Sequence, residues 1–238
     1  MQDLSFQRDA YFDGIRRIVP LAIPGLPFGF VLGVLITNEE LPAFAAWASS
    51  FIIFAGSSQL AALTLLAEDA SAFVVIMSVL LINSRHAMYS AALRHRFSSY
   101  PTGLRALMSY VLIDQQFAVT ETAEELVAPT PRYRLWHFLG GGSLLWTLWQ
   151  CTVALGVLVG DVVPESLNLG FAVPLLFIGL LALSVKNSPG VIAAVVGGVA
   201  AVLGSGLPQG SGLLLAIVLG VAAAGIAEAR QETNRATT

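Results

Sequence analysis

The sequence predicts an all-α integral membrane protein, a multi-pass bundle of hydrophobic helices. Of its 238 residues, 56% are hydrophobic and only 11% are charged, against about 25% charged in an average soluble domain. The mean hydropathy is +0.76, and the apolar residues gather in long runs separated by short polar segments. A soluble fold would need a polar exterior, which so few charged residues cannot cover.

Eight apolar segments follow one another along the chain. A helix that crosses a bilayer needs about 20 residues, and most of the segments reach that length, although the last three are short. We expect one transmembrane domain over residues 18–227, preceded by a cytoplasmic segment, 1–17, and followed by a cytoplasmic tail, 228–238. The segments have the approximate bounds 18–36, 42–66, 72–93, 104–120, 136–159, 171–185, 190–203 and 212–226.

The basic residues predict how the segments are threaded, because Lys and Arg concentrate in cytoplasmic loops. If all eight segments crossed, the arginines that follow the third segment would lie outside. If the second and fourth are broken or re-entrant, all basic residues between the segments fall on the side of the N-terminus. We therefore expect about six full crossings plus two broken or re-entrant segments (seven to eight crossings if those two span), with both termini cytoplasmic. The inner set is Arg94, Arg96, Arg105, Arg132, Arg134, Lys186, Arg230 and Arg235, and the outer loops hold Glu39, Glu40, Glu68, Asp69, Asp161 and Glu165.

The second segment contains a polar interruption, FAGSSQL at residues 54–60. Glycine and serine allow the backbone to leave helical geometry, and irregular backbone at membrane depth persists only where it faces protein or a water-filled cavity. Two interpretations stay open: a substrate-binding break of the kind found in transporters, or a kink packed by small residues. The candidate residues are Gly56, Ser57, Ser58 and Gln59. The fourth segment ends in LIDQQFA, residues 112–118, and is too polar to face lipid.

Arg85 is an ionisable residue at membrane depth. It stands nine residues before Arg94, which places it roughly 13 Å into the membrane at about 1.5 Å per residue. A charge there faces the bundle interior, paired or hydrated, and Asp114 is the one acid inside an apolar segment away from its ends. Either the two form a structural pair, or Arg85 or His86 contacts a substrate or relays protons, since histidine titrates near physiological pH. Asn83 shares a helical face with His86.

The first segment combines glycines and prolines. Glycine recurs every four residues, at Gly25, Gly29 and Gly33, which gives a stripe of small residues that lets another helix approach closely. Three prolines between Pro20 and Pro27 remove backbone hydrogen bonds and bend the chain. We expect the glycines to serve helix packing.

Other functional classes find little support in the sequence. There is no nucleophile or metal cluster at ligand spacing, so we predict no enzyme, no metal and no cofactor. The net charge of −3 and the absence of a basic patch argue against nucleic acid. A channel would use the same broken helices without saturable transport, whereas a scaffold would need no charge at membrane depth. Cys151 lies in an apolar run, and we expect it to pack.

Four motifs occur in a fixed order: PLAIPGLPFG at 20–29, FAGSSQ at 54–59, NSRH at 83–86 and DQQFA at 114–118. Together they resemble the AzlC family, the large subunit of branched-chain amino acid exporters. The resemblance is specific from about residue 14 to 117 and rests on length and hydropathy beyond. It implies export of leucine, isoleucine, valine and, in some members, methionine, driven by the proton gradient. It also implies a separate small membrane subunit of the AzlD type in a bacterial inner membrane; a homo-oligomer is left open.

The resemblance also assigns candidate site residues. An apolar zwitterion is expected near the midplane, its carboxylate at Arg85 and its ammonium facing Asp114 or Gln116. The family commonly has Asp-Glu where this chain has Asp114-Gln115, which leaves room for different coupling or another substrate. The alternative functions are a membrane channel or an exporter of a different small zwitterionic or anionic solute. The predicted substrate-binding set is Gly56, Ser57, Ser58, Gln59, Asn83, Arg85 and Gln116, and the predicted proton-coupling residues are His86 and Asp114.

Overall fold

A computed structural model describes residues 2–38, 42–127, 130–162, 178, 181, 185, 187–207 and 211–236. Every regular element in these residues is helical, which confirms the predicted all-α class. Two compact units divide the chain, Met1–Gln59 with Asn83–Pro164 and Leu60–Ile82 with Glu165–Thr238. The helices are α1 (Gln2–Ala22), α2 (Gly25–Asn38), α3 (Ala43–Ile52), α4 (Gly56–Ala67), α5 (Ala72–Phe97), α6 (Thr102–Tyr110), α7 (Asp114–Val127), α8 (Pro131–Val159), η1 (Gly160–Val162), α10 (Ser188–Leu203) and α11 (Ser211–Ala236).

Three helices among the described residues, α5, α8 and α11, are long and apolar enough to cross a membrane. Taken together, α1 and α2 are also long and apolar enough to cross a membrane, which raises the number of candidate spans among the described residues to four. The predicted count of six crossings stays a prediction. The sixth apolar segment, 171–185, lies almost wholly outside the described residues, and α10 has only 16 residues.

The first apolar segment is two helices rather than one. The axes of α1 and α2 differ by 66°, and the break lies at Ile23 and Pro24. Proline cannot donate a backbone hydrogen bond, and it disfavours helical geometry in the residue before it. The prolines therefore separate this segment into two helices, whereas only a bend was predicted. α1 also extends back to Gln2, so most of the predicted N-terminal segment is helical.

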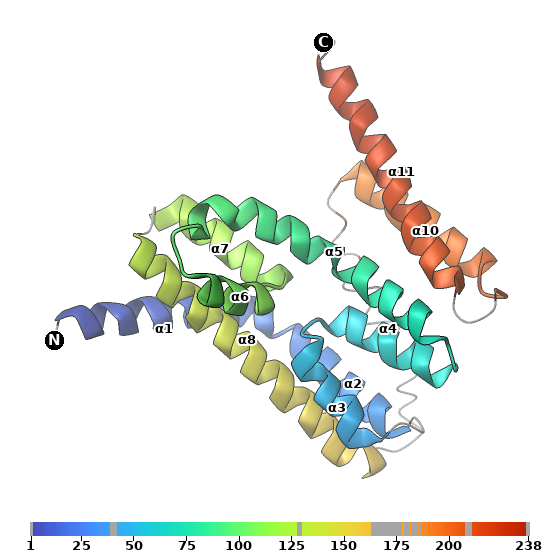
Figure 1. The fold of residues 1–238 in the computed structure, drawn as a ribbon, viewed down its shortest axis with the longest axis horizontal. Helices are drawn as coiled ribbons and strands as arrows, with labels where there is room; N and C mark the ends of the chain where they lie inside the picture. The colour runs from blue at the N-terminus through green and yellow to red at the C-terminus, as the bar shows by residue number, and fades with distance from the viewer. Residues whose placement is uncertain are drawn as a thin grey trace. The chain divides into compact units, whose positions relative to one another are not determined.

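In the first unit, α1 and α2 both pack along the long helix α8 (Figure 1). The approach is very close: a Cβ atom on Gly14 would lie 2.0 Å from the carbonyl oxygen of His137, and one on Gly33 would lie 2.2 Å from that of Val153. Gly29 also contacts α8, whereas nothing lies within 4 Å of a Cβ on Gly25. The predicted packing stripe therefore holds for two of its three glycines.

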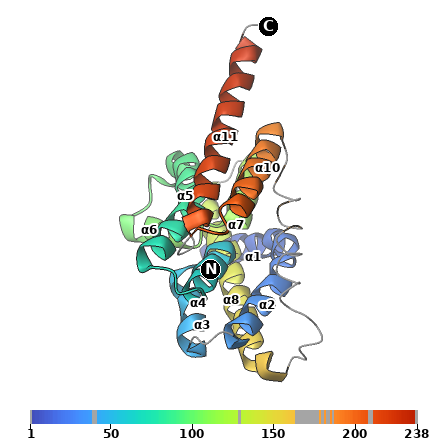
Figure 2. The ribbon, with the colours of Figure 1, turned by 90° about the vertical axis from the view of Figure 1, so that its right-hand side faces the viewer.

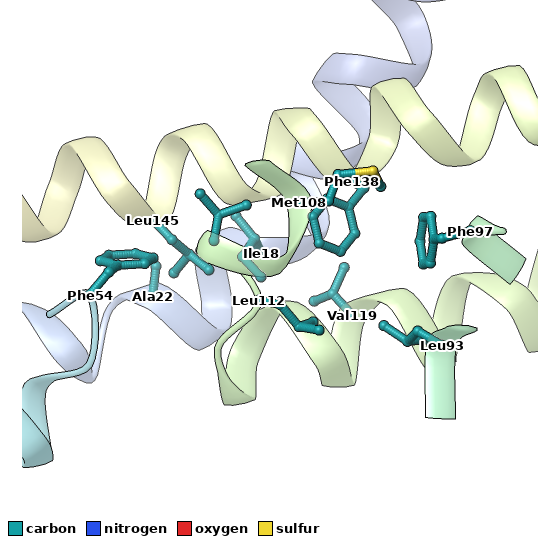
Figure 3. Packing of buried hydrophobic residues seen from close by; sticks show 11 residues of the cluster. Ile18, Ala22, Phe54, Leu93, Phe97, Met108, Leu112, Val119, Phe138 and Leu145 are labelled. Atoms are coloured by element: carbon teal, nitrogen blue, oxygen red, sulfur yellow. The ribbon is translucent and has the colours of Figure 1, made fainter. Parts of the chain in front are cut away.

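A cluster of buried apolar side chains joins the helices of this unit (Figure 3). Phe138 of α8 is 1% exposed and meets Phe97 of α5 edge to face, with ring centroids 5.3 Å apart. By contrast, large apolar side chains on the outside are open, such as Ile52 at 83% and Leu158 at 81% exposed. An apolar exterior around a packed interior is what a helix bundle in lipid requires.

Both segments that were predicted to be broken are broken. The second segment separates into α3 and α4 at residues 53–55, and the fourth separates into α6 and α7 at 111–113. The first break precedes the predicted polar residues, because Gly56–Gln59 form the first turn of α4. Short polar side chains are favoured at helix N-termini, and the Ser58 hydroxyl donates to the Ala55 carbonyl at 3.0 Å. We call α4 and α7 the half-helices, because each begins within an apolar segment.

The second unit contains a hairpin of α10 and α11, which run side by side (Figures 1 and 2). The Asn187 side chain accepts a hydrogen bond from the Gly190 amide at 2.9 Å and caps the start of α10. Gly197 and Gly220 face each other across the pair, since a Cβ on Gly220 would lie 3.4 Å from the Gly197 Cα. Small residues thus let these two apolar helices approach closely.

Candidate functional site

Arg85, on α5, joins the N-terminal ends of the two half-helices. Its Nη1 donates to Asp114 Oδ2 at 2.6 Å, and its Nη2 donates to Ser57 Oγ at 3.2 Å. Asp114 is the first residue of α7 and Ser57 is the second of α4. The structure therefore contains the predicted Arg85–Asp114 ion pair and adds a contact to the other half-helix.

The two helix ends differ in charge. The first amides of a helix have no intrahelical acceptor, and the helix dipole makes this end positive. Asp114 compensates for that charge at α7, whereas the first turn of α4 contains no acidic residue. The start of α4 thus presents uncompensated amides beside the Arg85 guanidinium. Such an arrangement is suited to binding a carboxylate.

The ion pair leaves one donor and one acceptor unused. Arg85 Nε and Asp114 Oδ1 have no hydrogen-bond partner among the described residues. The two side chains are 31% and 41% exposed, but these two atoms are themselves buried, so a ligand reaches them only when the surrounding side chains move. A free N–H beside a free carboxylate oxygen complements a zwitterion, which carries one carboxylate and one ammonium group.

Gly56 lies where an aromatic pair approaches the start of α4. A Cβ atom on Gly56 would lie 2.4 Å from Phe28 Cε1 and 2.6 Å from Trp149 Cη2. The two rings, from α2 and α8, have centroids 5.8 Å apart. Glycine is therefore required for this close approach, and the rings form an apolar wall next to the polar end of α4.

Gln59 ties the half-helix α4 to α3, and Ser58 bonds to the break between them. Both side chains are fully buried. Gln59 Nε2 donates to Ser50 Oγ at 2.6 Å and to Ser49 Oγ at 3.0 Å. These two predicted site residues thus stabilise the break itself, and Gln59 Oε1 has no partner among the described residues.

His86 and Asn83 flank Arg85 on α5, and His86 interacts electrostatically with both members of the ion pair. The buried atoms His86 Nε2 and Asn83 Oδ1 have no hydrogen-bond partner in the described part of the chain. The His86 ring lies 6.1 Å from that of Tyr89. Tyr89 in turn stacks on Phe117 of α7 at 4.5 Å, so aromatic side chains link α5 to α7 near the pair.

Gln116 lies in the contact between α7 and α8 and not beside Arg85. Its side chain is fully buried, and its Nε2 donates to the carbonyl oxygen of Phe138 at 2.9 Å. A Cβ on Gly141 would lie only 2.7 Å from Gln116 Oε1. Gln116 therefore contributes to helix packing here, and its predicted contact with the substrate stays a prediction.

Sequence reasoning missed the side chains that satisfy the end of α3. Gln150 of α8 donates through Nε2 to the Ser50 carbonyl at 3.0 Å, and the Tyr110 hydroxyl donates to the Phe51 carbonyl at 2.7 Å. The last carbonyls of a helix need such partners when the helix ends within a membrane. The sequence did contain a signal for this contact, because Gln150 is a polar amide side chain inside a long apolar run.

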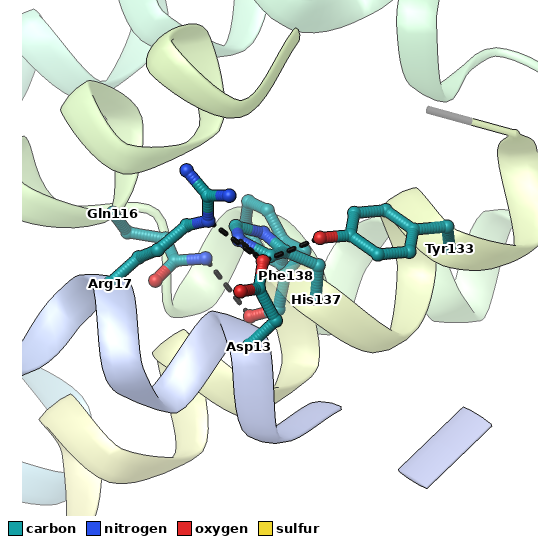
Figure 4. Close-up of polar contacts among 6 residues, drawn as sticks. All are labelled: Asp13, Arg17, Gln116, Tyr133, His137 and Phe138. Carbon is teal, nitrogen blue, oxygen red and sulfur yellow. Dashed lines mark hydrogen bonds and ion pairs between the residues drawn. The ribbon is translucent and has the colours of Figure 1, made fainter. Parts of the chain in front are cut away.

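A second polar cluster, also not predicted, connects α1 to α8 (Figure 4). Asp13 Oδ2 accepts from the Tyr133 hydroxyl at 2.5 Å and from Arg17 Nε at 2.7 Å. His137 Nε2 lies 3.6 Å from the same oxygen. The cluster is near the predicted cytoplasmic ends of both helices, and it reinforces the glycine contact there.

The comparisons with known proteins agree with the motifs. The model of the family described as AzlC protein matches residues 20–163, which contain every predicted site residue. The chain belongs to the AzlC family. This membership confirms the predicted resemblance, and it makes the chain a membrane protein, since its relatives in the family are named as membrane proteins.

Two relatives of this AzlC-family chain cover most of its length. Inner membrane protein YgaZ of Escherichia coli is 28% identical over 218 residues, 88% of this chain and 87% of that protein. An uncharacterized membrane protein of Archaeoglobus fulgidus is 30% identical over 203 residues, 83% of this chain and 86% of its own length. No solved structure matches the chain.

Proposed function

We propose that the chain is a secondary active transporter that exports branched-chain or other small apolar amino acids, namely leucine, isoleucine, valine and methionine. One observation carries the proposal: Arg85 links the N-terminal ends of two half-helices and leaves a donor and an acceptor free. Broken helices with their N-termini at a midplane charge are typical of transporter binding sites. Membership of the AzlC family, generally associated with branched-chain amino acid transport, supports it.

The proposed binding mode follows from the charges. The substrate carboxylate binds the first amides of α4, at Gly56 and Ser57, and the Arg85 guanidinium. The ammonium group binds Asp114 Oδ1, which has no partner among the described residues. The apolar side chain lies toward the rings of Phe28 and Trp149. Each substrate group thus meets a complementary group, and apolar side chains beside a few polar groups suit an apolar amino acid.

Proton coupling is proposed for Asp114, with His86 as a second proton carrier. A proton on Asp114 removes the negative charge that binds both Arg85 and the substrate ammonium. Protonation therefore competes with substrate binding, and such competition can couple the two fluxes in opposite directions. The His86 atom Nε2 is buried without a partner in the described residues, so it is available to a proton or a water molecule.

The proposed setting is the inner membrane of a bacterium, with both termini cytoplasmic and a small AzlD-type subunit as partner. Many large apolar side chains are exposed on the first unit, including Phe44 at 75%. Lipid and a membrane partner are the two surfaces that can cover them.

The experiment is efflux of radiolabelled leucine, isoleucine, valine, methionine and lysine from preloaded cells that lack their own exporter. The chain is expressed with and without its candidate small subunit, and with and without a protonophore. We expect saturable efflux of the apolar amino acids, lost with the protonophore. Efflux that does not saturate would indicate a channel instead, and no efflux with both proteins in the membrane would reject the substrate class.

A further inference from the structure

A cavity of about 300 Å³ lies in the first unit between α5, α6 and α8. It is separate from Arg85 and its partners. Its floor consists of side chains that are each less than 9% exposed, Leu93, Phe97, Met108, Leu112 and Phe138. A volume at the low end of the range for small-molecule sites, with an apolar floor, fits a hydrocarbon segment.

Two arginines lie at this cavity without an acidic partner. Arg94 and Arg105 both line it and are exposed. Neither forms an ion pair with a described residue, and Arg105 donates only to the Thr102 hydroxyl, at 3.1 Å. The neighbouring Arg96, in contrast, pairs with Glu121. The cavity between α5, α6 and α8 therefore combines an apolar floor with two positive charges that have no acidic partner among the described side chains.

The helix above the cavity has the features of an interfacial helix. α6 has only nine residues and buries Met108 at 4% while exposing Leu107 at 51%. A helix this short cannot span a bilayer, and its exposed arginine, Arg105, favours the membrane surface for the N-terminal end of α6, because a charge within the bilayer is costly. Arg94, near the end of the candidate span α5, lines the same cavity as Arg105.

We propose that this cavity is a binding site for an anionic phospholipid of the cytoplasmic leaflet. The phosphate binds between Arg94 and Arg105, and a segment of one acyl chain lies on Leu93, Phe97 and Phe138. The cytoplasmic leaflet is negatively charged, and basic pockets between membrane helices on that side bind anionic head groups. The site does not depend on the proposed transport function. Its effect is to attach α6, and through α6 the half-helix α7, to the membrane surface.

The test measures lipid retention by the purified full-length chain in non-ionic detergent, by native mass spectrometry during titration with phosphatidylglycerol. Phosphatidylcholine with the same acyl chains is the reference lipid. We expect preferential binding of phosphatidylglycerol, weakened about 30-fold in Arg94→Gln/Arg105→Gln, because each basic residue near a membrane surface changes affinity about fivefold. Arg8→Gln/Arg16→Gln is the matched control. It removes the same charge from exposed positions of α1 and should leave the affinity within about twofold.

Two further variants separate the cavity from surface charge. Ala106→Trp fills the cavity, which Ala106 lines, and should weaken phosphatidylglycerol binding although both arginines remain. Arg94→Lys/Arg105→Lys keeps the charge and should retain most of the binding, which guards against misfolding as the cause of a loss. Equal weakening in the control double variant, or no effect of Ala106→Trp, would overturn the proposal. Binding of glycerol phosphate as tightly as the lipid would also overturn the proposal. Displacement of the lipid by leucine would overturn it too, because the cavity would then belong to the substrate pathway.

Discussion

Arg85 is the residue on which the proposed mechanism depends. Its planar guanidinium offers several donors in a fixed geometry, and the structure uses two of its nitrogens for two different helices. A lysine could supply the charge, but its donors all lie on one nitrogen, so it could not reproduce the contacts that two separate nitrogens of Arg85 make with Asp114 and Ser57. The arginine is thus both a link between the half-helices and a candidate ligand for a carboxylate.

The two roles of Arg85 can be separated by a double variant. Arg85→Gln and Asp114→Asn should each lower the thermal stability of the purified protein and reduce leucine efflux about 30-fold or more, because each leaves a partner charge unpaired. The double variant removes both charges, so it should regain thermal stability without regaining efflux. Unfolding midpoints in detergent and efflux rates measure the two effects. A double variant that exports leucine normally would show that the pair is only structural.

Substitution of Gly56 tests the close packing around the start of α4, not its charge. Gly56→Ala places a methyl group 2.4 Å from the Phe28 ring, so the ring must move or α4 must shift. We expect efflux to fall several-fold while the protein stays in the membrane, since overpacking typically costs about 1–3 kcal/mol. Phe28→Ala combined with Gly56→Ala should recover part of the lost efflux, because it makes room for the methyl group. Unchanged efflux in Gly56→Ala would remove this aromatic wall from the site.

At the scale of helices, the close contacts of α1 and α2 with α8 can be tested with matched alanines. Gly33→Ala drives a Cβ to 2.2 Å from the Val153 carbonyl, and backbone atoms cannot rotate away, so the helices must separate. We expect a loss of about 1–3 kcal/mol of stability, seen as a lower unfolding midpoint. Gly25→Ala is the control, because nothing lies within 4 Å of its Cβ, and it should be neutral or slightly stabilising. Equal effects of the two variants would contradict the packing role of Gly33.

The breaks in the helices were largely predictable from sequence, and so was the ion pair. A charge within an apolar run has few available partners, which is why Arg85 and Asp114 could be paired before any coordinates. The exact position of the first break was missed by a few residues. Serine and glycine are favoured both in irregular backbone and in the first turn of a helix, so sequence alone could not distinguish these two states at residues 56–59.

Other parts of the site depend on packing that has no local signal. Gln116 follows Asp114 by two residues, and neighbours this close on a helix point in different directions. Its amide nitrogen therefore reaches the Phe138 carbonyl, a contact that the sequence pattern did not indicate. Gln150, in turn, is distant in sequence from the carbonyl at Ser50 that it satisfies. Its partner depends on how α8 packs against α3, which hydropathy does not encode.

At the scale of the whole molecule, the long helices share one asymmetry. Arginines lie at only one end of each candidate span: near the C-terminal end of α5, at the start of α8, and near the C-terminal end of α11. Under the positive-inside rule, we expect these three ends in the cytoplasm. With that orientation, the break between α3 and α4 would be reached from the outside and the start of α7 from the cytoplasmic side, and both half-helices begin at Arg85. This orientation would explain why two breaks serve one site.

Cysteine labelling tests this orientation directly. In a Cys151→Ser background, Glu68→Cys lies in the turn before α5 and Ser98→Cys lies just after it, both exposed. The 26 residues of α5 extend roughly 39 Å, more than the about 30 Å core of a bilayer, so the two positions lie on opposite sides. A membrane-impermeant maleimide should label Glu68→Cys in intact cells and Ser98→Cys only after the cells are opened. Labelling of both from outside would mean that α5 does not cross. The reverse pattern would invert the molecule, place Arg94 and Arg105 in the outer leaflet, and require the direction of transport to be reassigned.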